Sequence, residues 1–117
     1  VSIGNFQMVQ ALLADMYTDL ETMRALTYQL GREIQNISRG EGGRGVVHKR
    51  SAAAVLHAGR ASMRVLDSAV QIHGGMGFMR ESEVNRLYRS GKVLEIGAGT
   101  NQVRQLIVAN ELLRESV

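Results

Sequence analysis

The sequence has no cysteine and no proline among its 117 residues, and only 4% of them are aromatic. The lack of cysteine excludes a disulfide framework, a thiolate zinc site and a thiol nucleophile. Scarce aromatics mean that Leu, Val, Ile, Met and Ala must fill the core. No apolar run approaches the roughly 20 residues of a membrane-spanning helix. No signal peptide opens the chain, and its start at Val1 rather than methionine indicates that a segment has been removed upstream.

The chain also has little excess of charge of either sign. The formal net charge is +3, with a pI near 9.8, and acidic residues are interspersed along most of the chain. Nucleic-acid binding requires a basic face rather than a slight surplus, and the basic stretch at residues 39–50 lacks aromatic side chains for base stacking. His48, His57 and His73 do not share metal-ligand spacing, so neither a nucleic-acid partner nor a metal is expected.

The apolar residues that are present follow helical periods. From Phe6 they alternate in steps of three and four, which is the heptad stripe of one long helix with Asn5 as its expected N-cap. The stripe contains Phe6, Val9, Leu13, Met16, Leu20, Met23, Thr27, Leu30 and Ile34. The glycine-rich residues 38–45 then predict a loop between antiparallel helices.

A second helix is expected over residues 46–72, with a close-packing stripe of mostly small residues and a second buried face. The stripe contains Ala52, Val55, Gly59, Ser62, Leu66 and Ala69, and the second face contains Leu56, Met63 and Val70. Gly74 and Gly75 are expected to end this helix with left-handed backbone.

Two further helices complete the predicted fold. A short helix is expected over about residues 81–93, and a last helix over residues 101–115 with Thr100 as its N-cap. Their inward residues are predicted to be Val84, Leu87 and Tyr88 in the first, and Val103, Leu106, Ile107, Asn110 and Leu113 in the second. Because no alternating strand pattern is present, the sequence predicts one all-α domain over residues 1–117, an up-and-down helical bundle.

Two short motifs leave alternatives open. The segment HGGMGF, residues 73–78, lacks the third glycine of a dinucleotide-binding fingerprint and follows a helix rather than a strand. It is a structural turn or a set of accessible backbone N–H groups that suits a diphosphate, and the two interpretations are compatible. Glu95 lies beside the glycine-flanked turn at residues 97–99, but one acid without a partner is weak support for a general base.

Three segments, QIHGGMGF, RLYRSGK and GAGTNQVRQLIVA, occur in an order and spacing that closely resemble the C-terminal α-helical domain of the acyl-CoA dehydrogenases. The segment IGNFQMVQALLADMYTDL resembles a helix of the same domain, so the resemblance covers almost the entire chain. The family's enzymes use FAD to place a double bond between the α and β carbons of an acyl-CoA. The resemblance therefore implies FAD, an acyl-CoA substrate, an electron-transfer flavoprotein as partner and a homo-oligomer, a tetramer in the full enzyme. It also implies a soluble protein of the bacterial cytoplasm or the mitochondrial matrix.

The turn before the last helix departs from the commonest family pattern. Most members read Tyr-Glu-Gly-Thr there, and the glutamate removes the α-proton. Here the frame reads Gly97-Ala98-Gly99-Thr100, a variant that is similar to isovaleryl-CoA dehydrogenases, which carry the glutamate on a preceding helix. The resemblance thus implies no catalytic base in this chain. It leaves Ala98 and Gly99 as substrate contacts, because the Ala98 amide can stabilise charge on the thioester oxygen. A plain helix-entry turn is the alternative.

Cofactor contacts follow from the same resemblance. It implies FAD contacts at Gln7, at Gln71, Ile72, His73, Gly74 and Gly75, and at Thr100, Asn101 and Gln102. The middle group matches residues that contact the cofactor of a neighbouring subunit, and the last group matches contacts within the same subunit. Gln7 is equally well read as a surface glutamine.

The family's preceding helix, its N-terminal helical domain and its middle β-domain are not in this sequence. We therefore expect a bundle that is incomplete by its first helix, exposes an apolar face, self-associates and shows no acyl-CoA oxidation alone. A non-catalytic helical scaffold or assembly subunit derived from this family is the competing hypothesis. An oxidase of the same superfamily is a third.

Overall fold

The protein is described by a computed structural model that covers residues 1–37 and 45–117. The main helices are α1 (Gln7–Gln35), α2 (Val46–His73), α4 (Glu83–Gly91) and α5 (Asn101–Glu115). A four-residue helix α3 (Gly75–Phe78) follows α2, and short 3-10 helices η1 (Ile3–Asn5) and η2 (Lys92–Glu95) precede α1 and follow α4. In these ranges the chain contains helices and no strand, so the predicted all-α class is confirmed.

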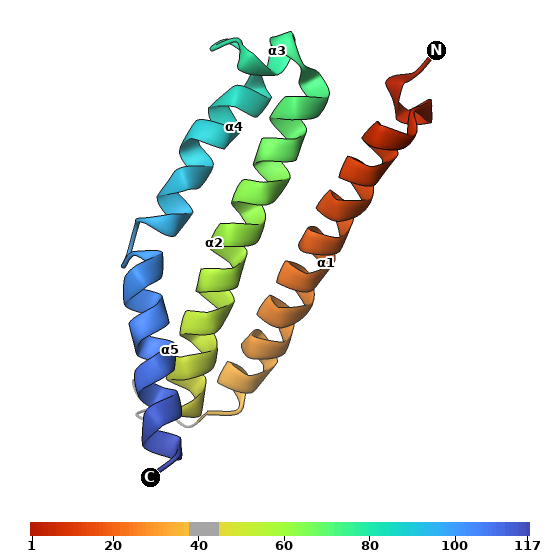
Figure 1. Cartoon of the computed structure of the whole chain (residues 1–117). Coiled ribbons are helices and arrows are strands. Elements are labelled where there is room, and N and C mark those ends of the chain that lie inside the picture. Colours follow the sequence, from red (N-terminus) through yellow and green to blue (C-terminus); the bar gives the residue numbers. More distant parts are fainter. Residues whose placement is uncertain (38–44) are drawn as a thin grey trace.

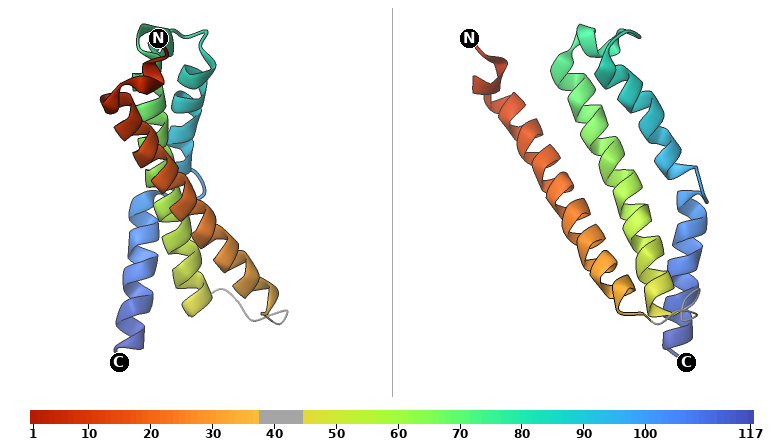
Figure 2. Two further views of the ribbon diagram at one scale, coloured as in Figure 1. Left: turned by 90° about the vertical axis from the view of Figure 1, so that its right-hand side faces the viewer. Right: turned by 180° about the vertical axis from the view of Figure 1, so that it is seen from behind.

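Helix α2 is the centre of the molecule (Figure 1). Helix α1 runs antiparallel along one side of it, and α4 and α5 follow one another along the other side, as the right-hand view of Figure 2 also shows. In the left-hand view α1 crosses α2 obliquely. The chain is elongated, with extents of 57 × 27 × 25 Å and a radius of gyration of 17.6 Å. A compact domain of this length has a radius of gyration of about 13 Å, so the helices form an open layer rather than a closed bundle.

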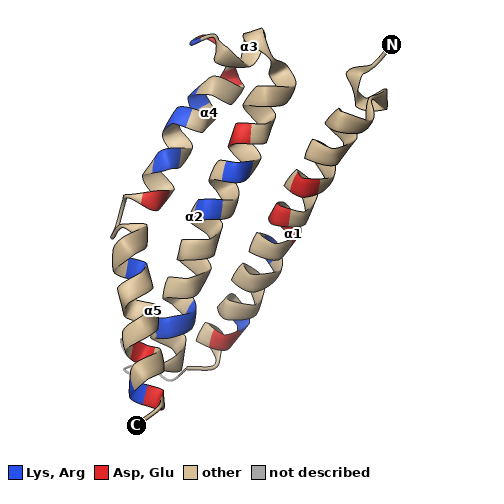
Figure 3. Ribbon diagram, viewed as in Figure 1, with Lys and Arg blue, Asp and Glu red and all other residues tan. Residues whose placement is uncertain are grey.

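The half-buried face of α1 repeats with the predicted heptad period, but only about half of the predicted residues lie on it. Val9, Met16, Met23 and Leu30 are half-buried as predicted, whereas Leu13, Leu20, Thr27 and Ile34 are exposed. Their places are taken by Leu12, Asp19, Leu26 and Glu33. For two of these positions the reason is electrostatic, because Asp19 pairs with Arg64 and Glu33 with Arg50 of α2. Figure 3 shows where acidic and basic residues lie along the two helices.

The predicted N-cap of α1 is wrong. Asn5 ends η1, and Phe6 holds the N-cap position in extended conformation without a side-chain cap. The Gln10 side chain donates a 3.0 Å hydrogen bond to the Gly4 carbonyl, and this bond ties η1 to the first turn of α1.

Small residues allow close packing around α2, as the sequence predicts. Ala52 and Gly59 are buried, together with Ala54 and Ala61, whereas Val55 is exposed and was misplaced. A Cβ at Gly59 would lie 3.2 Å from the Leu94 carbonyl oxygen, so glycine allows the backbone before α5 to approach α2 closely. The predicted loop at residues 38–45 lies outside the described residues except for Gly45, the N-cap of α2.

The end of α2 differs slightly from prediction. The helix extends one residue further, to His73, and Gly74 ends it at a positive φ of 59° as expected. Gly75 does not share that conformation, because it begins α3, a helix that the sequence reading missed. Gly77 within α3 is buried, since a Cβ there would lie 2.6 Å from the Val70 carbonyl oxygen.

The C-terminal helices differ most from the prediction. The predicted 81–93 helix is α4 followed by η2, and Leu87 is 42% exposed rather than inward. The bounds of α5 are confirmed, but its predicted inward face is wrong: Val103, Leu106, Asn110 and Leu113 are exposed, and only Ile107 is half-buried. The buried residues are Asn101, Arg104 and Glu111. These polar side chains face inward because hydrogen bonds satisfy them there: Arg104 binds two main-chain carbonyls, Asn101 binds the Glu95 and Arg104 side chains, and Glu111 accepts from the Gly45 N–H. The exposed apolar residues of α5 are left in contact with solvent.

No helix within the described ranges combines the length and the apolar content needed to cross a bilayer.

Candidate functional site

The turn between η2 and α5 has an unusual backbone. Ala98 has a φ of +53° and Gly99 a φ of +101°, and Ala98 is the only non-glycine residue with positive φ in the described ranges. The left-handed region costs an L-residue roughly 1–2 kcal/mol, so the surrounding structure must hold Ala98 there. Ala98 is exposed, and Gly97 and Gly99 beside it are half-buried. The turn therefore presents its main chain to solvent.

Thr100 caps α5 as predicted. Its Oγ1 accepts a 3.2 Å hydrogen bond from the Val103 N–H, which is one of the helix's unsatisfied donors. The remaining free N–H groups and the helix dipole make this end of α5 favourable for an anion. The hydroxyl proton of Thr100 can still be donated to a ligand.

A buried polar network lies behind the turn. The Arg104 guanidinium donates 2.8 Å hydrogen bonds to the carbonyl oxygens of Leu94 and Gly97, and a 3.2 Å bond to Asn101 Oδ1. Asn101 Nδ2 in turn donates a 2.7 Å bond to Glu95 Oε2, and Glu95 Oε1 lies 3.2 Å from Lys92 Nζ. In the described part of the chain no buried side-chain polar atom lacks a partner. The network holds both ends of the turn to α5.

Sequence reasoning missed Arg104 and gave Glu95 no structural role. The available signal was the helical spacing: Arg104 follows the capping residue Thr100 by four positions, on the same face as Asn101. A polar residue on the inward face of a terminal helix turn is positioned to bind loop carbonyls. The apolar residues Val103 and Leu106 instead led to the prediction that a different face of α5 points inward.

The second group of candidate cofactor residues lies where α2 ends. Gln71, His73, Gly74 and Gly75 are exposed, and Ile72 is half-buried. His73 Nδ1 is 2.7 Å from the Ala69 carbonyl oxygen, which fixes the ring against its own helix. A Cβ at Gly74 or Gly75 would meet nothing within 4 Å, so the backbone is open to a ligand.

The two groups do not come together within one chain. The C-terminal end of α2 and the N-terminal end of α1, which begins at Gln7, lie toward one end of the molecule, whereas α5 begins about midway along α2 (Figure 1). The same placement follows from Gly59, in the middle of α2, whose added Cβ would lie 3.5 Å from Asn101 Oδ1.

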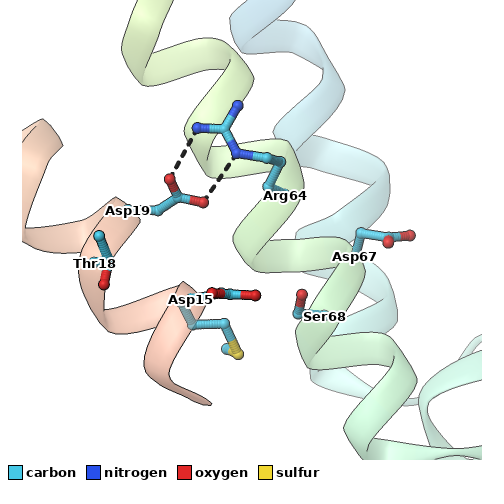
Figure 4. Close-up of a pocket in the computed structure, with 7 residues that line it drawn as sticks. Asp15, Thr18, Asp19, Arg64, Asp67 and Ser68 are labelled. Atoms are coloured by element: carbon cyan, nitrogen blue, oxygen red, sulfur yellow. Dashed lines mark hydrogen bonds and ion pairs between the residues drawn. The ribbon is translucent and has the colours of Figure 1, made fainter. Parts of the chain in front are cut away.

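A polar groove of about 350 Å³ separates α1 from α2. Asp15, Met16, Thr18, Asp19, Arg64, Asp67 and Ser68 line it (Figure 4). Hydrogen bonds from Arg64 hold the pKa of the Asp19 carboxyl below its usual value, and the same bonds raise the pKa of Arg64. Asp19 and Arg64 thus neutralise one another and link α1 to α2, while the carboxylates of Asp15 and Asp67 also line the groove.

An apolar groove of about 390 Å³ lies on the other side of α2, between α1, α4 and η2. Met23, Ser62, Val65, Leu66, Leu87, Ser90, Gly91, Val93 and Leu94 line it. Gly91 packs closely against Leu66, because a Cβ there would overlap Leu66 Cδ1 and the leucine side chain would have to shift. The groove reaches Leu94, whose carbonyl group Arg104 binds.

Comparison with known proteins identifies the family of the chain. The sequence profile of the family described as "Acyl-CoA dehydrogenase, C-terminal domain" matches residues 1–113. Mitochondrial isovaleryl-CoA dehydrogenases from Oryza sativa and Arabidopsis thaliana are 39% and 36% identical over 113 residues, which is 97% of this chain and 26% of each relative. The caffeyl-CoA reductase-Etf complex subunit CarC of Acetobacterium woodii is 33% identical over 97% of this chain and 28% of that relative.

The chain thus spans about a quarter of the length of the relatives it matches. The match extends across both described ranges, including the turn at Ala98 and the end of α2. The isovaleryl-CoA-dehydrogenase likeness expected from the Gly-Ala-Gly-Thr turn is confirmed by these relatives. Because the family model matches residues 1–113, the chain belongs to the acyl-CoA dehydrogenase C-terminal domain family.

Proposed function

We propose that this chain is the C-terminal domain of an FAD-dependent acyl-CoA dehydrogenase of fatty acid or branched-chain amino acid catabolism. It forms one wall of the active site and contributes FAD and thioester contacts, but not the catalytic base. The observation that carries the proposal is the exposed Ala98 main chain, which is held at positive φ beside the capped N-terminus of α5. An exposed main chain at this turn suits the backbone N–H contact with the thioester that the family resemblance implies.

The residues present fit the cofactor. The open main chain at Gly75 and the N-terminus of α5 both present backbone N–H groups that favour a diphosphate or another anion. The Gly74 N–H already donates to the Gln71 carbonyl oxygen at 3.1 Å, so Gly74 contributes open space rather than a donor. FAD, when bound, accepts the hydride that leaves the β carbon of the acyl-CoA. Gln7, Gln71 and His73 are exposed near the first of these sites, and Gln102 is exposed at the second.

Three residues at the start of α5 have different tasks. The Thr100 hydroxyl both caps the helix and is available to the cofactor. The side chain of Asn101 is buried and bonded to Glu95 and Arg104, so its contact with FAD is made through the backbone N–H. Gln102 contributes its side chain.

The substrate contact lies at Ala98. Negative charge develops on the thioester oxygen when the α-proton leaves, and a preorganised N–H stabilises that charge. A methyl side chain cannot accept the proton, so the base must come from outside this chain. Ala98 provides the backbone donor, and Gly99 leaves room for the thioester to approach.

The open architecture supports a partner. The chain exposes 8368 Å² at a mass of 12.8 kDa, whereas a compact monomer of that mass exposes about 6,300 Å². The excess surface carries large apolar side chains such as Leu106 and Leu113. We propose that it is covered by the rest of the enzyme and by further subunits of a homo-oligomer, and that an electron-transfer flavoprotein reoxidises the flavin.

The test is steady-state oxidation of acyl-CoA thioesters with an artificial electron acceptor. The complete protein that carries this chain should turn over, with branched short-chain thioesters as the first substrates to examine. The 117-residue chain alone should not, because it lacks a base at Ala98. Turnover by the isolated chain would refute the missing base, and a complete protein that binds no FAD would instead be the non-catalytic scaffold.

A further inference from the structure

Arg104 is the least accessible cationic side chain in the described structure. It is 6% exposed, and its guanidinium forms no ion pair with a carboxylate in residues 1–37 or 45–117. Taking an arginine out of water without a counter-charge is unfavourable by several kcal/mol unless good hydrogen bonds replace the water. Here three oxygen atoms accept from it, two of them main-chain carbonyls at 2.8 Å.

One of those carbonyls has a direct connection to the proposed oxyanion donor. The Gly97 C=O and the Ala98 N–H belong to the same trans peptide unit. In a trans peptide these two groups are coplanar and point in opposite directions. Because Arg104 NH2 binds the Gly97 oxygen from the inside, the Ala98 N–H is directed away from the network.

The same bond affects the strength of the donor. A cation that hydrogen bonds to a carbonyl polarises the whole amide, so the N–H on the other side becomes a better donor. The effect is largest where water is excluded, and Arg104 is buried. The bond thus both orients the Ala98 N–H and makes it more positive.

The rest of the network keeps Arg104 in place. Asn101 Oδ1 accepts from NH1, and Glu95 Oε2 accepts from Asn101 Nδ2 at 2.7 Å. The Leu94 carbonyl gives Arg104 a second main-chain anchor, three residues before Gly97. Two anchors fix the plane of the guanidinium, which a single bond would leave free to rotate.

We propose that Arg104 is a positioning residue for the dehydrogenation: through the Gly97 carbonyl it aims and polarises the Ala98 N–H that stabilises the enolate-like oxygen. This inference rests on the proposed function and goes beyond it, because it assigns the strength of the oxyanion donor to a side chain that touches neither substrate nor cofactor.

The test compares Arg104→Lys and Arg104→Gln with the wild-type holoenzyme. Lysine keeps the charge but has no planar fork to bind both carbonyls, and glutamine loses the charge. We expect kcat to fall about 10- to 100-fold with KM little changed, because the interaction strengthens only in the transition state. Arg114→Gln, on the exposed end of the same helix, serves as control and should keep wild-type kcat.

A second readout separates positioning from simple loss of structure. An acyl-CoA analogue with a stabilised enolate should bind the Arg104 variants about 10- to 100-fold more weakly. The corresponding thioether, which lacks the carbonyl oxygen, should bind the wild type and the variants equally. Equal weakening of both ligands would make Arg104 merely structural and overturn the inference. Arg104→Lys keeps most of the volume and charge, and provides the test if Arg104→Gln does not fold.

Different results would refute the two proposals. A wild-type holoenzyme that turns over, together with Arg104 variants that keep kcat and enolate affinity, would overturn the role of Arg104 alone. A wild-type protein that binds no FAD and oxidises no acyl-CoA would overturn the proposed function, and the inference would fall with it.

Discussion

The Asp19 carboxylate of α1 accepts two hydrogen bonds from the Arg64 guanidinium of α2, from Nε to Oδ2 at 3.0 Å and from NH2 to Oδ1 at 2.8 Å (Figure 4). This bidentate pair connects the two long helices near the polar groove. Arg64 is more than half exposed, so the pair is partly screened by solvent.

We expect Asp19→Asn to lower the free energy of unfolding by about 0.5–1 kcal/mol at neutral pH. The Arg64 bonds hold the pKa of Asp19 below its usual value in the folded chain. The stabilisation is therefore complete above the unfolded carboxyl's pKa of about 3.9 and is lost as pH falls through the lowered folded pKa. Urea unfolding of both proteins from pH 7 downward should show the difference shrinking in acid. Asp15→Asn, in the same groove, is the control, and a difference that grows in acid would contradict the assignment.

Gly77→Ala should destabilise the protein by about 1–3 kcal/mol, the usual range for an overpacked site. The new Cβ would lie 2.6 Å from the Val70 carbonyl oxygen and 3.2 Å from Val70 Cα, and this backbone cannot move without disturbing α2. The matched variant is Gly75→Ala in the same short helix, where a Cβ meets nothing within 4 Å. Thermal unfolding of the pair checks the prediction, and equal midpoints would show that α3 does not pack as described.

Glu111→Gln should cost about 1 kcal/mol of stability, because a partly buried carboxylate at a helix N-terminus is favourable by that order. Glu111 is 6% exposed, and its Oε2 accepts a 3.1 Å hydrogen bond from the Gly45 N–H at the start of α2. Glu115→Gln removes only a half-exposed ion pair with Lys49, so it should cost less. Denaturant midpoints decide this, and the opposite order of the two variants would refute the role of Glu111 at the helix terminus.

The isolated chain should self-associate through its exposed apolar face. Leu106 is 62% and Leu113 is 66% exposed on α5, and such contiguous surface favours association. Sedimentation velocity should give a mass that rises above 12.8 kDa with concentration. Leu106→Glu should shift the chain toward monomer, whereas Gln105→Glu, also exposed on α5, should not. A concentration-independent monomer would contradict the prediction.

The sequence predicted the three longest helices better than it predicted which of their faces are buried. Periodicity and capping residues located α1, α2 and α5 within a few residues, and Thr100 caps α5 as predicted. The prediction of the inward face of α5 was wrong. Apolar periodicity identifies a face that can be buried by a partner, but within the described residues nothing covers Val103 or Leu106.

The candidate site was likewise only partly predictable from the sequence. Ala98 and Gly99 were placed in a turn by family resemblance, and the positive φ of Ala98 could not be read from an alanine. Arg104 was missed because its partners are main-chain carbonyls, which carry no residue-specific signal in a sequence. α3 was missed because four residues are too few for a period to show.

The most direct measurement of the central claim is the absorbance spectrum of the complete protein during anaerobic addition of a branched short-chain acyl-CoA. The account predicts a bound flavin whose absorbance bleaches with one equivalent of thioester, since we propose that the exposed Ala98 turn and the capped α5 N-terminus bind a thioester beside FAD. A protein without flavin, or one whose flavin stays oxidised with every acyl-CoA supplied, would contradict it.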